Sequence, residues 1–216
     1  MIDAVLPADV VSVETYGDAD DLFPEEAALV ARAVEKRRRE FASARWCAHK
    51  ALAELGCAAG PNLAGPKHEP LWPEGVIGSL THCDGYRAAA VARAGRLAAV
   101  GIDAEPHSTL PDGVLEVVAR PEEIPALAEL RSRHPATHWD KVMFSAKESV
   151  YKAWFPLARR WLDFQDATVR FEPAARTFVV ELEQVGPEVG GVALTRMRGR
   201  FAVEGGFVVT AVVVEG

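Results

Sequence analysis

Three carboxylates in this sequence are candidate ligands for a divalent cation, and two of them have the spacing to share one. Asp103 and Glu105 stand two residues apart in the run VGIDAEP, at the end of an apolar segment. Alternate side chains of an extended chain share one face, so both carboxylates point the same way and Ala104 points the other. Two neighbouring carboxylates repel each other unless a cation neutralises them, and Mg²⁺ takes oxygen ligands of this kind. An exposed strand end would carry the same pattern, so the pattern alone is weak.

The third carboxylate, Glu148, lies in FSAKESVYKAW, which predicts a helix from about residue 137 to 155 that stops at Pro156. Glu148 and Lys152 are one turn apart and therefore side by side, on a polar stripe that also carries Lys141 and Ser145, for which no role is predicted. Apolar residues fill most of the circumference, which predicts a buried helix whose charged stripe faces a partner, a ligand, a metal or a wet cleft. The alternative is an ordinary Glu–Lys pair on a partly exposed helix. The main apolar face is Val142, Met143, Ala146, Val150, Ala153 and Trp154.

Cationic and hydroxyl side chains elsewhere are suited to phosphate oxygens. Arg37 falls on the core-facing side of a second predicted helix and Arg45 on its edge, where an unpaired guanidinium needs an anion. A snorkelling arginine or a salt bridge is the alternative. Thr81 and His82 end a strand-like run, although a lone histidine there is more often structural. Cys83 follows His82, but no third group orients the pair, which argues against a cysteine nucleophile.

Together these groups form a set suited to phosphoryl-type transfer, in which a protein positions the reactants and neutralises charge. Neither G-x-x-x-x-G-K-[ST] nor G-x-G-x-x-G occurs, so a nucleotide would not be cradled in either of those ways. The residues alone leave two classes open, a Mg²⁺-dependent enzyme acting on a phosphate ester and a non-enzymatic coenzyme A or nucleotide-binding module.

The elements that must position these side chains follow from periodicity and turn residues. Residues 1–24 read as acidic and irregular, and a Pro/Gly-rich loop over 60–75 carries Lys67 and His68. Trp161 and Phe164 are expected to fold back on the 137–155 helix. Two other helices are predicted, one over 25–55, in which one break is allowed, and one over 121–133. The predicted strands are 76–81, 88–93, 97–103, 168–172, 178–183, 195–203 and 207–214.

Composition indicates a globular α+β chain with two halves, 1–106 and 107–216, each with a long helix and about three antiparallel strands. The net charge of −7 argues against nucleic-acid binding. No apolar run long enough to span a membrane and no signal peptide are visible, so a cytoplasmic protein is expected. Cys47, Cys57 and Cys83 have no metal-ligand spacing and are predicted to be reduced thiols packed in the core.

Four segments, RRREFASARWCAHKAL, GSLTHCDGY, VGIDAEP and FSAKESVYKAW, in this order and at these separations, resemble the Sfp/EntD-type 4′-phosphopantetheinyl transferases, above all their actinobacterial members. The resemblance runs from Glu25 to the C-terminus. It implies two similar α+β halves related by a pseudo-twofold axis, with coenzyme A and Mg²⁺ in the cleft between them, in a monomer. The implied reaction moves 4′-phosphopantetheine from coenzyme A to a serine of an apo carrier protein and releases adenosine 3′,5′-bisphosphate.

The resemblance also implies a role for each matching residue. Asp103, Glu105 and Glu148 would bind the metal, and Glu148 is the candidate general base. Ala104 stands where some relatives carry another residue. The coenzyme A contacts would be Lys152 on the pyrophosphate, Arg45 and His82 with Thr81 on the 3′-phosphate, Arg37 nearby, and Lys67 and His68 on the nucleotide phosphates.

The implied partners are apo acyl or peptidyl carrier proteins, or carrier domains of polyketide, nonribosomal peptide or fatty-acid synthases. Such carriers commonly present an acidic helix, so local basic and apolar side chains of the second half are candidates for docking. These are Arg159, Arg160, Arg196, Arg198 and Arg200, beside Leu157 and Leu162, which are expected to be exposed.

Overall fold

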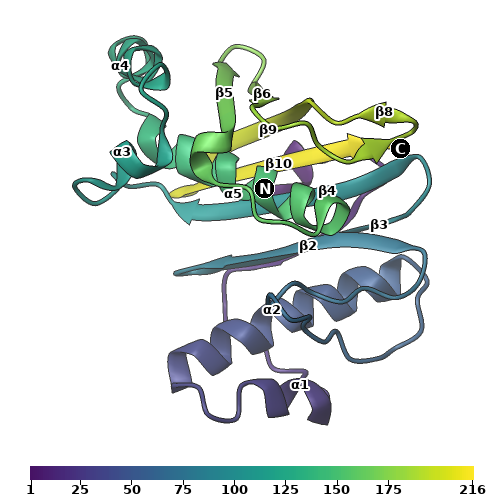
Figure 1. Cartoon of the computed structure of the whole chain (residues 1–216). Coiled ribbons are helices and arrows are strands. Elements are labelled where there is room, and N and C mark those ends of the chain that lie inside the picture. Colours follow the sequence, from purple (N-terminus) through teal and green to yellow (C-terminus); the bar gives the residue numbers. More distant parts are fainter.

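The computed structural model describes all 216 residues and divides its strands between two main antiparallel sheets (Figure 1). The smaller sheet has the order β1 (Val11–Thr15), β3 (Tyr86–Arg93), β2 (Val76–Cys83). Helix α2 (Glu35–Glu54) packs on it through Cys47, Ala48, Ala51 and Leu52, and the short α1 (Pro24–Leu29) precedes α2. The α2 side chains at these positions recur every three or four residues, so one helix face meets the sheet.

The larger sheet has the order β4 (Leu97–Pro106), β10 (Phe207–Glu215), β9 (Arg196–Glu204), β6 (Thr177–Leu182), β5 (Ala167–Glu172). Helix α5 (Trp139–Ala158) crosses one face of this sheet, and α3 (Val114–Val118) and α4 (Glu123–Arg133) lie between β4 and α5 in the chain. Two 3₁₀ turns, Ile2–Val5 and Phe164–Asp166, and a small ribbon of β7 (Glu188–Val189) and β8 (Val192–Ala193) complete the chain. The α+β prediction is confirmed.

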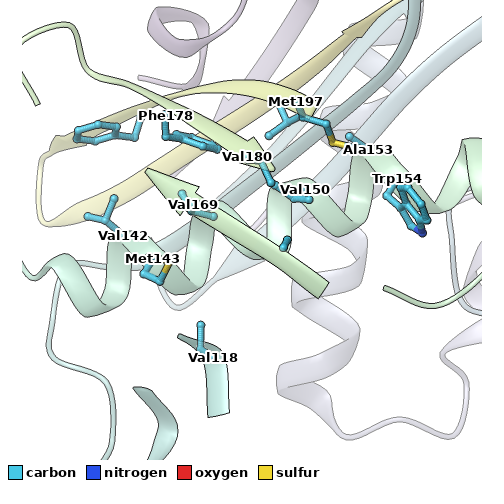
Figure 2. Packing of buried hydrophobic residues seen from close by; sticks show 14 of the residues in the cluster. Val118, Val142, Met143, Val150, Ala153, Trp154, Val169, Phe178, Val180 and Met197 are labelled. Atoms are coloured by element: carbon cyan, nitrogen blue, oxygen red, sulfur yellow. The ribbon is translucent and has the colours of Figure 1, made fainter. Parts of the chain in front are cut away.

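The apolar face predicted for α5 is the centre of the larger core. Figure 2 shows Val142, Met143, Val150, Ala153 and Trp154 of α5 against Val169, Phe178, Val180 and Met197 of the sheet. All of these side chains are buried, as the 3.6-residue periodicity predicts. This packing fixes the rotation of α5 and therefore decides which way its polar stripe points.

The two sheets meet at β2 and β4, where side chains take the place of a backbone ladder. The Ile102 N–H donates to Ser79 Oγ at 3.1 Å, and the Ala104 N–H donates to Thr81 Oγ1 at 2.9 Å. Because hydroxyls of β2 satisfy backbone donors of β4, the strand with the paired carboxylates is held at the junction of the two sheets. β4 is itself paired with β10 over nearly its whole length.

Gly101 allows α5 to lie directly on β4. A Cβ atom built at this position would come within 2.0 Å of the Ser149 carbonyl oxygen and 2.5 Å of the Ala153 backbone nitrogen. Both are far below normal contact, so only glycine permits this approach. The approach sets Asp103, two residues along the strand, beside the last turns of α5.

Several sequence predictions need correction. Residues 11–15 form the edge strand β1, although the N-terminal region was expected to be irregular. The first long helix is broken once, as allowed, at Val30–Val34, and α2 begins at Glu35. Val34 and Arg37, which were predicted to face the core, are exposed. Helix α5 continues past Pro156 to Ala158, since a proline in the last turn removes only one N–H bond.

The remaining elements agree with the sequence within two or three residues, with α3 and the β7–β8 ribbon as additions. Cys47 is buried, and Cys57 and Cys83 are half-buried against the smaller clusters; all three are free thiols. None of the helices is both long and apolar enough to span a bilayer. The division at residue 106 and the pseudo-twofold relation stay predictions.

Candidate active site

Asp103 is held from two sides at the junction of the sheets. The Lys152 ammonium of α5 donates to Asp103 Oδ1 at 2.7 Å, and the Thr81 hydroxyl of β2 donates to the same oxygen at 3.3 Å. The side chain is almost fully buried, and its other oxygen, Oδ2, has no hydrogen-bond partner. A buried carboxylate oxygen without a partner is unfavourable, and it suits a ligand that brings positive charge.

Glu105 points to the same side of β4 as Asp103, as the alternation predicts, while Ala104 packs into the opposite cluster. Its Oε2 accepts from the Lys141 ammonium at 3.3 Å, which gives a contact to a lysine that had no predicted role. Burial raises the pKa of Glu105, the Asp103 charge raises it further, and Lys141 lowers it. Ser145, the other residue without a role, hydrogen bonds to Thr210 of β10 and so fastens α5 to the sheet.

Glu148 is half-buried on α5 and makes no hydrogen bond or ion pair in the structure, not even with Lys152 one turn away. Burial raises the pKa of its carboxyl group, and repulsion from Asp103 raises it further, against the opposing effect of Lys152. The structure therefore places three carboxylates from two elements close enough to repel one another, with the lysine turned toward Asp103.

The donor set fits a hard divalent cation. The oxygens are carboxylates, and one of them is buried and without a partner. Burial and then repulsion between the carboxylates raise the pKa of both Glu105 and Glu148, and a bound cation would offset these costs. The side chains do not form a closed metal cage: no group of three His, Cys, Asp or Glu residues has ligand geometry. Lys152 and Lys141 supply the neighbouring positive charge instead.

A group of cationic side chains surrounds His82. Arg37 Nη1 lies 2.7 Å from His82 Nε2 and donates to it, while Glu40 Oε2 lies 3.8 Å from the other ring nitrogen. Burial and then the neighbouring Arg37 charge lower the pKa of His82 to about 4, against the opposing effect of Glu40, so the ring is neutral at pH 7. The neutral ring therefore accepts the Arg37 hydrogen bond, and a bound anion would be needed only if the ring were protonated beside this guanidinium.

Arg45 is the buried arginine of α2, with only 5% of its surface exposed. Its guanidinium lies 4.4 Å from the centre of the Phe41 ring, and its Nε has no hydrogen-bond partner. Burial lowers the pKa of Arg45 to about 10, although Glu26 opposes the shift. A buried cation with an unpaired donor is suited to a phosphate.

Arg87 is a buried cation that sequence reasoning missed. It stands opposite His82 in the β2–β3 ladder, pairs with Asp18 at 3.4 Å, and also has a buried Nε without a partner. Arg87 stands just before the strand predicted over 88–93, and no local pattern marked it. Its position opposite His82 depends on the register of β2 and β3.

The Thr81 hydroxyl is not directed to a phosphate site, and the loop residues Lys67 and His68 lie in an exposed turn. The Thr81 hydroxyl is buried, donates to Asp103 and accepts from Ala104, so its one proton is directed to the carboxylate and not to a phosphate. Lys67 and His68 are exposed in a turn closed by the His68 N–H and the Gly65 carbonyl at 2.9 Å. Glu69 beside them lies 3.5 Å from Arg159 at the end of α5, so the loop reaches that helix.

An apolar pocket of about 80 Å³ opens beside Glu148. Trp161 and Phe164 fold back on α5 as predicted, with ring centres 4.8 Å from Tyr151 and 5.9 Å from Phe144. The pocket lining is Lys147, Glu148, Val150, Tyr151, Trp161, Leu162, Asp163, Phe164 and Ala167. The site thus joins a charged region at β4 to an apolar recess along the same helix.

Neither leucine of the predicted docking surface is exposed, and Leu157 is half-buried against the larger core. Leu162 is buried, with 5% of its surface exposed, because it packs in the α5 core. Met197 and Phe201 of β9 also belong to that core, so the intervening Arg196, Arg198 and Arg200 project from the opposite face of the sheet, away from Glu148.

Carboxylates, lysines and arginines arranged in this way are suited to a phosphate-rich ligand together with a cation. Residues 25–92 match the family "4'-phosphopantetheinyl transferase N-terminal domain", and residues 99–194 match the "4'-phosphopantetheinyl transferase superfamily". The 4'-phosphopantetheinyl transferase Svp of Streptomyces mobaraensis is 52% identical over 99% of this chain and 89% of its own. PptT of Mycobacterium tuberculosis, another 4'-phosphopantetheinyl transferase, is 47% identical over 99% of this chain and 97% of its own.

A more distant relative is enterobactin synthase component D of Salmonella typhi, 34% identical over 55% of this chain and 48% of its own length. With two relatives near half identity over almost the whole chain, the family is shown. The chain belongs to the 4′-phosphopantetheinyl transferase superfamily and is a transferase of that kind.

Proposed function

We propose that this protein transfers the 4′-phosphopantetheine group of coenzyme A to a serine hydroxyl of apo acyl or peptidyl carrier proteins, with Mg²⁺, and releases adenosine 3′,5′-bisphosphate. The observation that carries the proposal is the arrangement of Thr81, Asp103 and Lys152 beside the unpaired carboxylate of Glu148. Three elements contribute to it: β2 from the smaller sheet, β4 from the larger sheet, and α5, which packs on the larger sheet. A binding module would have no use for carboxylates whose mutual repulsion is left uncompensated.

Asp103, Glu105 and Glu148 would hold the Mg²⁺ ion. When bound, the ion supplies positive charge that neutralises the phosphate oxygens as the leaving group departs. Lys152, which donates to Asp103 in the structure, would donate to the pyrophosphate when coenzyme A is bound. The 2.7 Å contact between Lys152 and Asp103 Oδ1 supports this, because it places the ammonium beside a carboxylate that would hold the ion.

The other cationic groups would bind the nucleotide end of coenzyme A. Arg45 and His82, with Arg37, would hold the 3′-phosphate, which would satisfy the unpaired Arg45 Nε. Lys67 and His68 would bind the nucleotide phosphates from the loop. Thr81 would act through Asp103, since its hydroxyl already donates a hydrogen bond to that carboxylate.

Glu148 would take the proton from the serine hydroxyl as the serine oxygen bonds to the phosphorus that carries pantetheine. The bond from that phosphorus to the bridging oxygen breaks, and the electron pair leaves with adenosine 3′,5′-bisphosphate. The position of Glu148 between the β4 carboxylates and the apolar recess supports this role. Docking of the carrier would use Arg159 and Arg160 at the end of α5, where Trp161 is 68% exposed.

Glu148→Gln tests the function. The substitution keeps the shape and removes the base, so holo-carrier formation should fall by about 10²–10⁴-fold, the usual contribution of a general base. Mass spectrometry of an apo carrier incubated with coenzyme A and Mg²⁺ follows the gain of one phosphopantetheine. The exposed Glu188→Gln is the matched control and should keep full activity. Near-normal turnover by Glu148→Gln would remove this residue from the mechanism.

Coenzyme A and Mg²⁺ should stabilise the fold jointly, which separates the enzyme from a metal-free binding module. Ligand present at 100 times its Kd adds about 2.7 kcal/mol of stability by mass action, and the gain should be much smaller with EDTA. Thermal unfolding with coenzyme A, in Mg²⁺ and in EDTA, measures it. Equal shifts in both buffers would contradict the metal role of Asp103, Glu105 and Glu148.

A panel of apo carriers from siderophore, polyketide and fatty-acid assembly would rank the partners. The relation to enterobactin synthase component D favours carriers of siderophore assembly among them. The mass gain per carrier, measured at one enzyme concentration, gives the order directly.

A further inference from the structure

Glu40 is a carboxylate that stands among the cationic groups proposed to hold the 3′-phosphate of coenzyme A. It lies on α2 three residues after Arg37, so the two side chains are neighbours on the helix surface, and both reach His82 near the end of β2. Only 14% of the Glu40 side chain is exposed. A fixed negative charge repels a phosphate, so a carboxylate at this place weakens the site unless it has another effect.

The ion pair of Glu40 with a lysine does not account for its position. Lys36 lies 3.9 Å from Glu40 and also 3.5 Å from Asp84, and the Lys36 side chain is 67% exposed. A long contact to an exposed ammonium contributes little to stability, because solvent screens it. The neighbour that Glu40 approaches on the protein side is the His82 ring.

The two nitrogens of the His82 ring face opposite kinds of group. Arg37 Nη1 donates to Nε2 at 2.7 Å, so the proton of the neutral ring is on Nδ1. Nδ1 faces Glu40 Oε2 at 3.8 Å. In the unliganded protein a neutral ring therefore matches both neighbours, with its lone pair toward the guanidinium and its N–H toward the carboxylate.

A bound phosphate changes one of these neighbours and leaves the other. In the proposed site Arg37 binds the phosphate, and a phosphate oxygen then faces Nε2, which must donate a hydrogen bond to it. A neutral ring with its proton on Nε2 would turn the lone pair of Nδ1 toward the Glu40 carboxylate. Acceptors on both sides of the ring are matched only by the imidazolium, which has two N–H donors.

We infer that binding of the 3′-phosphate is coupled to the uptake of a proton by His82, and that Glu40 is the positioning residue that requires the doubly protonated ring. The inference rests on the proposed function. The proton comes from solvent and bonds to Nε2, and the new N–H donates to a phosphate oxygen while Nδ1–H donates toward Glu40. No other bond forms or breaks. The site thus gains a positive charge only when the anion is present.

The other charged groups near the ring do not replace this proton. Lys152 of α5 is held by Asp103 at 2.7 Å, and Arg87 of β3 is held by Asp18 at 3.4 Å. Both lower the pKa of His82 by their charge, and neither is hydrogen bonded to its ring. The α2 side chains that flank the ring therefore decide which of its nitrogens must donate.

Calorimetric titrations in two buffers of different ionisation enthalpy count the protons taken up with a ligand. Coenzyme A is compared with dephospho-coenzyme A at pH 7 in Mg²⁺, because proton changes at the metal carboxylates and at the pyrophosphate are then common to both. Coenzyme A should take up about half a proton to one proton more, since the ring without an anion is neutral at this pH. The 3′-phosphate itself contributes little, because its second pKa is about 6.

The same coupling predicts a pH dependence of specificity. A group that takes up a proton on binding weakens binding by up to about tenfold per pH unit. The preference for coenzyme A, measured as the ratio of the two Kd values, should therefore fall about threefold to tenfold between pH 7 and 8.

Glu40→Gln separates the positioning role from a structural one. The amide can donate to Nδ1, so a neutral ring can then present Nε2–H to the phosphate. The extra proton uptake should disappear and the Kd ratio should no longer depend on pH, whatever happens to the affinity itself. Glu35→Gln is the matched control: it removes the same charge from the same helix, its side chain is exposed and paired with Arg38 at 3.5 Å, and it should keep the wild-type uptake.

Equal proton uptake with the two ligands in the wild type, or unchanged extra uptake in Glu40→Gln, would overturn the inference. Holo-carrier formation reports on the proposed function separately. An enzyme that forms holo-carrier without the extra proton uptake contradicts this inference alone, whereas a protein that binds no coenzyme A contradicts both.

Nitrogen NMR of labelled histidine gives a second readout that does not depend on affinity. The His82 signals, assigned through their loss in His82→Gln, should show a neutral ring protonated on Nδ1 in the unliganded protein. At pH 7 with saturating coenzyme A, both nitrogens should be protonated. A neutral ring in that complex would exclude the proton uptake.

Discussion

Lys147 and Lys152 stand on the same helix and each faces a carboxylate, yet their surroundings are opposite. Lys147 is 2% exposed, and its ammonium donates to Glu123 at 2.7 Å and to the Phe164 carbonyl at 2.8 Å. Glu123 in turn accepts from the Arg120 and Val169 backbone N–H groups at 2.7 and 2.5 Å. Every charge in this closed pair has partners inside the protein, so it ties α4, β5 and the 3₁₀ turn to α5 and leaves nothing for a ligand.

The pair of Lys152 and Asp103 is open by comparison. Asp103 keeps an unpaired buried oxygen, Glu148 has no partner, and repulsion raises the pKa of Glu148 and Glu105. Each pair joins a lysine of α5 to a carboxylate of another element. A Lys–carboxylate contact alone therefore does not mark a functional site. The unsatisfied groups around the contact mark it.

The sharpest way to break this comparison is to change neighbouring residues of α5. Lys147→Met should lower the free energy of unfolding by about 3–5 kcal/mol, because it leaves the Glu123 charge buried without its partner. Glu148→Gln, one residue away, should leave stability unchanged or slightly raised, since it removes repulsion. Denaturant unfolding of both variants, without ligand, measures the difference. If Glu148→Gln lost as much stability as Lys147→Met, the open pair would be structural as well.

A second test moves the open pair without touching its charges. Gly101→Ala places a methyl group 2.0 Å from the Ser149 carbonyl oxygen, so α5 and β4 must separate. Overpacking of this kind costs about 1–3 kcal/mol, and the activity should fall further than stability explains, because Asp103 moves away from Lys152. Unfolding and holo-carrier formation are measured on the same preparation.

The control for this test is Gly60→Ala, since nothing lies within 4 Å of a Cβ atom at that position. It should match the wild type in both measurements. A Gly101→Ala variant with wild-type activity would show that the spacing of β4 and α5 is not needed for the open pair.

Local patterns in the sequence predicted the elements well and the contacts between them only in part. The apolar face of α5 was predictable because Val142, Ala146, Val150 and Ala153 repeat at helical spacing and all face one core. The β1 strand was missed because a short run among acidic residues is a strand only through its pairing with β3.

For the candidate site, residue types could be predicted and partners could not. The family resemblance implied that Asp103, Glu105 and Glu148 lie together, but no pattern in the sequence indicated that Lys141 pairs with Glu105, that Thr81 donates to Asp103, or that Arg87 stands opposite His82. These contacts depend on strand register and on the approach of α5 to β4 at Gly101, which tertiary packing decides. The difference between Lys147 and Lys152 was likewise not visible in FSAKESVYKAW.

The smallest expected effect concerns His82, at the cationic side of the open site. Its pKa is lowered from 6.5 to about 4 in the folded protein, first by burial and then by Arg37, while in the unfolded chain it titrates normally. Between these values the unfolded state binds more protons, so this stability is present above pH 6.5 and is lost as the pH falls toward 4. His82→Gln should therefore show a shallower decrease in Tm between pH 6.5 and 4 than the wild type, with similar Tm at pH 8. Because 36% of the side chain is exposed, solvent screens the effect and the difference should be small. Parallel profiles for the two proteins would mean that Arg37 and burial do not hold the ring neutral, and that the cationic side of the site is less strained than its geometry implies.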